Sequence, residues 1–181
     1  MDSVVTSLLP ILLVPDPVLK TRARRVEPAD ADRVRALIPR MFAAMYAAPG
    51  IGLAAPQVGV GLRFVVIDLM PDEKSTPIVL INPEIIAASD ELATTEEGCL
   101  SLPGQYADVT RPARVTVRYH DAAGARHDLT AEGLLSACLQ HEIDHLDGVL
   151  FTDRISPLKR NMILRRLAKE LRQKREQADG R

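Results

Sequence analysis

The chain has 181 residues, 46% of them hydrophobic and 3% aromatic, which is enough for one domain with a buried core. Its 23 Lys and Arg nearly balance its 24 Asp and Glu, and the net charge of -1 gives no indication of DNA or of another strongly charged partner. The charge is uneven, because residues 151–181 hold ten basic and four acidic residues, a local net charge of +6 that leaves -7 for the rest.

The N-terminal segment has an apolar run from Leu8 to Val14, with no basic residue before Lys20 and two prolines close behind it. We expect neither a signal peptide nor a membrane span there, because the run is too short and has the wrong flanks. The only two cysteines, Cys99 and Cys138, cannot form a disulfide framework, and this favours a cytoplasmic protein.

A first helix is predicted between Asp30 and Ala48, ending at Pro49-Gly50. Apolar residues recur there with helical spacing, at Val34, Leu37, Ile38, Met41, Phe42 and Met45. Pro39 lies within this stripe, and we expect it to kink the helix or to shift its start.

Strands are predicted next, at residues 62–70 ("LRFVVIDLM") and 77–86 ("PIVLINPEII"), because both segments are short, rich in branched residues and bounded by Gly, Pro or Asp. Within residues 113–129, the apolar Val115, Val117 and Tyr119 alternate with the polar Thr116, Arg118 and His120 before a four-residue turn, which is typical of a hairpin.

Two further helices complete the prediction. Thr130 stands where an N-cap is expected for a helix from about Ala131 to Leu146. A basic C-terminal helix is predicted from near Ser156, at about 156–178, with Ile163, Leu167 and Leu171 on one face. The order of helix, several antiparallel strands, helix and helix indicates a single α+β domain over residues 1–181.

The segment "LLSACLQHEIDHLDG" (134–148) places polar side chains in an apolar helix, where their burial requires compensation. His141 and His145 are four residues apart, so both lie on one face and could bind one metal ion. With Glu142 they form the H-E-x-x-H pattern, in which the Glu acts on metal-bound water. The alternative is a pair of hydrogen-bonded core histidines beside surface carboxylates.

Two imidazoles require a third protein ligand. Cys138 does not fit, because it lies about 7.5 Å along the helix axis from an ion midway between the histidines. Glu170 would be a ligand in the manner of gluzincins, but it lies on the basic helix. Cys99 remains, in a segment whose Gly98 and Pro103-Gly104 indicate a tight turn where backbone can approach a ligand. Taken alone, Cys99 would be a small core residue.

Three motifs, "GIGLAAPQVG" (50–59), "EGCLSLPG" (97–104) and "QHEIDHLDG" (140–148), resemble the signature motifs of bacterial peptide deformylases, in order and in spacing. The resemblance runs from "LVPDPVLK" (13–20) through the final helix. It implies antiparallel β-sheets around a central metal-binding helix, with N-terminal and C-terminal helices. It also implies a hydrolase that removes the formyl group from the N-terminal formyl-methionine of newly synthesised polypeptides.

The resemblance further implies the roles of individual residues. The metal ligands would be Cys99, His141 and His145, with water in the fourth position and Glu142 as proton acceptor and donor. The metal would be Fe²⁺, with Zn²⁺, Ni²⁺ or Co²⁺ as possible substitutes. The Gln57 side-chain amide and the Leu100 backbone N–H would stabilise the oxyanion, although a loop amide bonded to nearby backbone is the alternative for Gln57.

The remaining implied residues would bind substrate. Ile51 and Gly52 would pair with the peptide backbone as an added strand, near Gly98. The methionine pocket would be lined by Leu134, Ala137 and Cys138. Tyr106 stands at the pocket rim, where many members have Arg.

The resemblance implies N-formylmethionyl peptides and nascent chains as partners. The basic C-terminal helix could contact ribosomal RNA, with a solvated charged surface as the alternative. Asp144 and Arg111 are candidates to support the histidine ligands, unless they form a plain surface ion pair.

Two other functions stay open. An HExxH metallopeptidase would cleave unformylated peptides and keep its metal without Cys99, and a non-enzymatic metal-stapled ribosome-binding module would bind metal without turnover.

Overall fold

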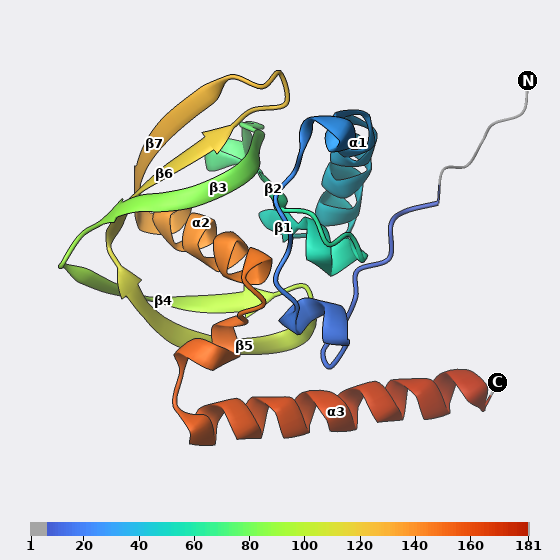
Figure 1. The fold of residues 1–181 in the computed structure, drawn as a ribbon. Coiled ribbons are helices and arrows are strands. Elements are labelled where there is room, and N and C mark those ends of the chain that lie inside the picture. The colour runs from blue at the N-terminus through green and yellow to red at the C-terminus, as the bar shows by residue number, and fades with distance from the viewer. Residues whose placement is uncertain (1–6, 181) are drawn as a thin grey trace, which may run out of the picture.

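The computed structural model describes residues 7–180 and encloses one long helix between β-strands (Figure 1). Residues 1–6 and 181, which the predicted domain includes, lie outside this description. The helices are α1 (Ala31–Ala47), α2 (Gly133–Leu146) and α3 (Pro157–Asp179). The strands are β1 (Gly52–Ala54), β2 (Phe64–Ile67), β3 (Ile78–Ala88), β4 (Leu92–Cys99), β5 (Leu102–Pro112), β6 (Arg114–His120) and β7 (Arg126–Glu132).

The strands form two antiparallel sheets. One has five strands in the order β1-β2-β3-β6-β7, and the other is the hairpin of β4 and β5. In Figure 1, α2 lies between the larger sheet and this hairpin, and α3 runs along the outer side of β5. The predicted α+β fold, with antiparallel sheets around a central helix, is therefore confirmed.

Helix α2 is buried along most of its length because apolar residues cover several of its faces. Cys138, Leu139, Ile143 and Leu146 join residues of β2, β3, β6 and β7 in one apolar core. The predicted start of this helix was wrong. Thr130 and Ala131 belong to β7, where they pair with Thr116 and Val115 of β6, and the helix begins at Gly133. The pairing of β7 with β6 therefore continues past Thr130, the residue that was expected to cap the helix.

The amphipathic helix predicted near the N-terminus is confirmed as α1. Its apolar stripe packs on β1 and β2 in a second core, with Val34, Leu37, Met41 and Met45 buried. Pro39 lies inside the helix, eight residues after its start at Ala31, so it does not set where the helix begins.

The predicted strands are present with different ends. The segment 62–70 forms strand only at Phe64–Ile67, and 77–86 extends to Ala88 as β3. Pro83 in β3 accompanies a register shift against β6, which accommodates a residue that cannot donate to the ladder. The hairpin of β6 and β7 has five intervening residues rather than four, and Asp121 accepts hydrogen bonds there from the Ala123 and Ala125 N–H groups.

Helix α3 begins after Ser156, as predicted, and the Ser156 side chain caps it by accepting a hydrogen bond from the Lys159 N–H. Ile163 and Leu167 are buried in a third core with Leu102 and Val109 of β5. This packing leaves the basic residues on the outer side of the helix. No helix within residues 7–180 is long and apolar enough to cross a membrane.

Candidate metal centre

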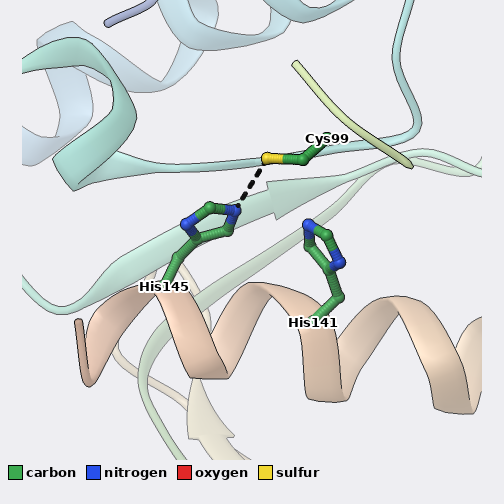
Figure 2. A group of neighbouring side chains, drawn as sticks. All are labelled: Cys99, His141 and His145. Carbon is green, nitrogen blue, oxygen red and sulfur yellow. Dashed lines mark hydrogen bonds between the residues drawn. The ribbon is translucent and has the colours of Figure 1, made fainter. Parts of the chain in front are cut away.

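Three side chains converge at the turn end of the β4–β5 hairpin. Cys99 is the last residue of β4, and His141 and His145 extend toward it from adjacent turns of α2 (Figure 2). One ligand atom from each residue lies within 4.8 Å of the other two, and Cys99 Sγ is 3.3 Å from His145 Nε2. Within residues 7–180 this is the one group of His, Cys, Asp or Glu with such spacing.

The surroundings of the histidines fit a metal site. His141 Nδ1 lies 3.0 Å from a Glu97 carboxylate oxygen, which leaves Nε2 available as a ligand. Burial lowers the pKa of His145 well below its usual value, so the ring is neutral, as ligation requires. One thiolate and two imidazoles suit zinc, iron, cobalt or nickel. These three residues therefore form a metal-binding group, and the prediction from spacing and motifs is confirmed to this extent.

Behind His141 lies a buried network of charged side chains. Arg111 donates two hydrogen bonds to Glu97, at 2.6 and 2.9 Å, and one to Asp144 at 2.8 Å. Asp144 also accepts from Arg154. Because Arg111 is only 6% exposed, the alternative of a plain surface ion pair is wrong. Although burial opposes ionisation, the hydrogen bonds from Arg111 and His141 lower the pKa of Glu97 to about 2, so it is a carboxylate at neutral pH.

Glu97 was not singled out from the sequence, although a signal was present. It precedes Cys99 by two residues in a strand, and residues two apart in a strand point to the same face. A carboxylate that reaches the same side as a metal ligand is a natural acceptor for the ring N–H of a histidine ligand.

Replacement of Arg111 with leucine is expected to destabilise the protein by about 3–5 kcal/mol, because it leaves Glu97 and Asp144 buried without their shared partner. Urea denaturation of the metal-loaded protein measures this change. The matched control is Arg118→Leu, which removes a bidentate but half-exposed ion pair with Asp128 and should cost about 1 kcal/mol or less. Equal losses in the two variants would contradict the importance of the buried network.

Glu142 is adjacent to the first histidine and is 4% exposed. Its Oε2 atom is buried and has no hydrogen-bond partner among the described residues. Burial raises the pKa of Glu142 to about 7, with a smaller opposing effect of His141. A carboxylate with a pKa near neutrality, in a cleft and beside metal ligands, is suited to accept and return a proton.

Gly52 in β1 provides the space for this carboxylate. A Cβ atom at Gly52 would lie 2.6 Å from Glu142 Oε1 and 2.9 Å from its carboxyl carbon. We expect Gly52→Ala to displace Glu142 and to lower kcat by about a hundredfold, since a misplacement of about 1 Å can have such an effect. Gly61→Ala is the control, because no atom lies within 4 Å of its added Cβ. Wild-type kcat in Gly52→Ala would contradict this requirement for space.

Gln57 lies in a short 3-10 turn after β1 and is fully buried. Its Oε1 accepts from the Ala54 N–H at 3.0 Å, which turns the NH₂ group toward Ser101 Oγ, at 3.1 Å, and Cys99 Sγ, at 3.6 Å. Gln57 thus forms the backbone hydrogen bond that was expected of a plain loop amide. The same bond orients its NH₂ group toward the metal-binding group. Leu100 lies in the turn between β4 and β5, next to Cys99.

A cleft of about 560 Å³ opens over this group. Every predicted site residue except the more deeply placed His145 lines it. The predicted substrate-binding residues are among them, namely Ile51, Gly52, Gly98, Tyr106, Leu134, Ala137 and Cys138. Gln105 of β5, which was not predicted, also lines the cleft and donates a hydrogen bond to Glu170 of α3 at 3.1 Å. Glu170 therefore forms a hydrogen bond with β5, and it is not a member of the metal-binding group, so it is not the third ligand.

Comparisons with known proteins agree on one family. The sequence pattern of polypeptide deformylase matches residues 8–161. The peptide deformylase of Agrobacterium fabrum is 50% identical over 169 residues, which are 93% of this chain and 99% of that protein. The peptide deformylase of Xylella fastidiosa is 54% identical over 168 residues, covering 92% of this chain and 98% of that one. The crystal structure of a peptide deformylase from Legionella pneumophila superposes with a TM-score of 0.86 at 48% identity, covering 93% of this chain and 98% of the other.

Proposed function

The chain belongs to the polypeptide deformylase family, and we propose that it removes the formyl group from formyl-methionyl peptides with Glu142 as the proton-transfer group of the site. The observation that carries the proposal is the buried Oε2 of Glu142, which has no hydrogen-bond partner among residues 7–180 and lies beside three converging ligand side chains. The enzyme is a metal-dependent peptide deformylase, EC 3.5.1.88, and the assignments to individual residues below are our proposal.

Glu142 moves the proton in this mechanism. The oxygen of a water molecule attacks the formyl carbon while Glu142 takes one of its protons. The bond between the formyl carbon and the methionine nitrogen then breaks, and Glu142 returns the proton to the departing amine. Formate and a peptide with a free amino terminus result. The pKa of about 7 lets the same carboxyl group perform both transfers near neutral pH.

Gln57 and Leu100 bind the oxygen that becomes negatively charged. The Gln57 amide is fixed by its hydrogen bonds to Ala54 and Ser101, so its donor needs no reorganisation during the reaction. A preorganised donor of this kind is worth about 2.7–4 kcal/mol in the transition state. The Leu100 N–H supplies a second donor next to Cys99.

Cys99, His141 and His145 would hold the metal, which we propose to be Fe²⁺, one per chain, replaceable by Zn²⁺, Ni²⁺ or Co²⁺. When bound, such a cation supplies Lewis-acid chemistry, because it lowers the pKa of coordinated water and polarises a carbonyl. Glu97 and Arg111 orient His141 for this purpose.

The substrate lies in the cleft. Ile51 and Gly52 pair with its backbone at the free edge of β1, which ends the five-stranded sheet, and Gly98 approaches it from β4. Leu134, Ala137 and Cys138 on α2 receive the methionine side chain, and Tyr106 lies at the rim.

We further propose that residues 1–181 form one catalytic domain in the cytoplasm, where formylated nascent chains leave the ribosome. Both cysteines are free, which fits a reducing compartment.

Helix α3 carries exposed basic residues that suit ribosomal RNA, at Lys159, Arg165, Arg166, Lys169, Arg172, Lys174 and Arg175. Cosedimentation with ribosomes tests this contact, and binding that survives Arg165→Glu and Arg166→Glu together would contradict it.

Formate release from formyl-Met-Ala peptides tests the proposed function. Protein purified without oxygen should contain iron, and the ferrous, zinc, nickel and cobalt forms should be assayed in parallel. We expect formate from formylated peptides and no cleavage of the same peptides without the formyl group. Absence of formate from metal-loaded protein, or cleavage within unformylated peptides, would refute the proposal.

A further inference from the structure

Arg154 connects the solvent to the buried charge network behind the metal-binding group. It lies in the short 3-10 turn Phe151–Arg154, which follows α2. Its Nη2 and Nε atoms donate to Oδ1 and Oδ2 of Asp144, at 2.7 and 3.0 Å. The Arg154 side chain is 48% exposed, whereas that of Asp144 is 11% exposed. Arg154 is therefore the member of the network that water and small solutes can reach.

A continuous series of hydrogen bonds leads from Arg154 to a histidine of the metal-binding group. Asp144 Oδ2, which accepts from Arg154 Nε, also accepts from Arg111 Nη1. Arg111 donates from Nε and Nη2 to the two oxygens of Glu97, and Glu97 Oε2 lies 3.0 Å from His141 Nδ1. Each arginine thus holds one carboxylate with two hydrogen bonds, which fixes the plane of that carboxylate. The direction of the His141 ring depends on a series that begins at the surface.

Arg154 also neutralises the network. Two carboxylates, those of Glu97 and Asp144, are buried with a single guanidinium group, that of Arg111. Arg154 supplies the second positive charge, so the charges of the four side chains cancel. Without Arg154 the two carboxylates would compete for Arg111, and a hydrogen bond that moves toward Asp144 is lost by Glu97. A weaker hold on Glu97 would in turn loosen His141.

A recess beside Arg154 gives small molecules access to the same place. It has a volume of about 190 Å³, and its lining includes Arg111, Gln140, Asp144 and Arg154. Truncation of Arg154 would enlarge this recess and open the side of Asp144 that now accepts two hydrogen bonds. A free guanidinium ion has the size and the paired donors to occupy the space that the side chain leaves.

We propose that Arg154 is a positioning residue of the metal centre, and that it acts through the buried network to hold His141 in the orientation that binds the metal ion. Arg154 is not among the described residues that line the substrate cleft, so it acts on the reaction only through other side chains. The inference concerns retention of the metal and does not depend on which reaction the metal serves. Loss of a group that orients a histidine ligand typically lowers metal affinity about 10–100-fold.

Zinc affinity, measured by competition with a chromophoric chelator, provides the test. Arg154→Ala should bind Zn²⁺ about tenfold more weakly than the parent protein. Arg154→Lys keeps the charge but loses the planar pair of donors, and it should bind about threefold more weakly. Arg118→Ala is the matched control, because it removes another half-exposed arginine with two hydrogen bonds to an aspartate, Asp128, on the β6–β7 hairpin. This control should keep the parental affinity.

Chemical rescue separates positioning from a general loss of structure. In about 50 mM guanidinium chloride, which is well below denaturing concentrations, Arg154→Ala should regain about threefold in zinc affinity. The same concentration of sodium chloride should restore nothing, because Na⁺ cannot donate hydrogen bonds to Asp144. The parent protein and Arg118→Ala should respond equally to the two salts.

Parental zinc affinity in Arg154→Ala, or losses of equal size in Arg154→Ala and Arg118→Ala, would overturn the inference. Equal restoration by guanidinium and sodium chloride would overturn it as well. If Arg154→Ala does not fold, Arg154→Lys decides, since parental affinity in that variant would contradict a need for the paired donors. Formate release is measured on the same zinc-loaded parent protein, and its absence would refute the proposed function without affecting the result on metal binding.

Discussion

Glu142→Ala is expected to abolish almost all formate release, with kcat reduced by about a thousandfold to ten-thousandfold. Proton transfer by a positioned side chain accounts for about 10²–10⁴ in rate. Among the described residues that line the cleft, Glu142 is the one buried carboxylate that is not paired with Arg111. The measurement is formate release from formyl-Met-Ala, with the metal content of each preparation determined in parallel.

Glu142→Gln separates this chemistry from packing, because glutamine fills the space beside Gly52 but cannot shuttle the proton. It should lose as much activity as the alanine variant. Glu91→Ala serves as the control, since this carboxylate is exposed and lies outside the cleft. If Glu142→Gln keeps more than about a tenth of the parental kcat with its metal bound, another group carries the proton.

The two histidines of the metal-binding group could be predicted from the sequence because their geometry depends on a short spacing. Two histidines four residues apart on a helix face the same side in any fold, and the apolar neighbours of His141 and His145 indicated burial. Cys99 could be assigned only through the motifs, since its distance from α2 depends on how the β4–β5 hairpin packs. The partnership of Glu97 with Arg111 joins residues on paired strands, and that pairing was not foreseen.

The helices were predicted better than the sheets. The apolar stripes of α1 and α3 are local patterns, and both helices are present where the patterns indicated. Strand β4 was missed because its outer residues are mostly exposed and polar, so it lacks the alternation by which a strand is recognised. Strand β4 is stabilised by pairing with β5, which has eleven residues, and by the ion pair between Glu97 and Arg111. These contacts join residues that are distant in the sequence.

The start of α2 illustrates the same limit. Thr130 and the residues after it satisfy the local preferences of a helix N-terminus, but pairing with β6 continues as far as Glu132. Cross-strand contacts, including the hydrogen bond between the Thr116 and Thr130 hydroxyls, outweigh the intrinsic capping preference. Local propensity therefore predicts that the helix exists, but it does not predict the residue at which the helix begins.

Cys99→Ala is expected to remove the metal, and this prediction separates a deformylase site from an ordinary HExxH peptidase site. Without the thiolate only His141 and His145 remain in the group, and a catalytic metal site requires about three protein ligands. Metal analysis after dialysis should find less than about a tenth of an equivalent bound. The melting temperature of the parent should fall on chelation, because a bound metal stabilises the folded state by mass action, and that of the variant should not change.

Cys138→Ala is the matched control, because it removes the other thiol that lines the same cleft. Burial raises the pKa of Cys138 well above its usual value, so the side chain remains a neutral thiol, which is a poor ligand. This variant should therefore retain a full equivalent of metal and the parental response to chelation. Metal retained by Cys99→Ala would mean that another group completes the site, and loss of metal from Cys138→Ala alone would reassign the sulfur ligand. The two cysteines lie in one cleft, but the geometry of β4 and α2 gives only Cys99 a position between the two imidazoles.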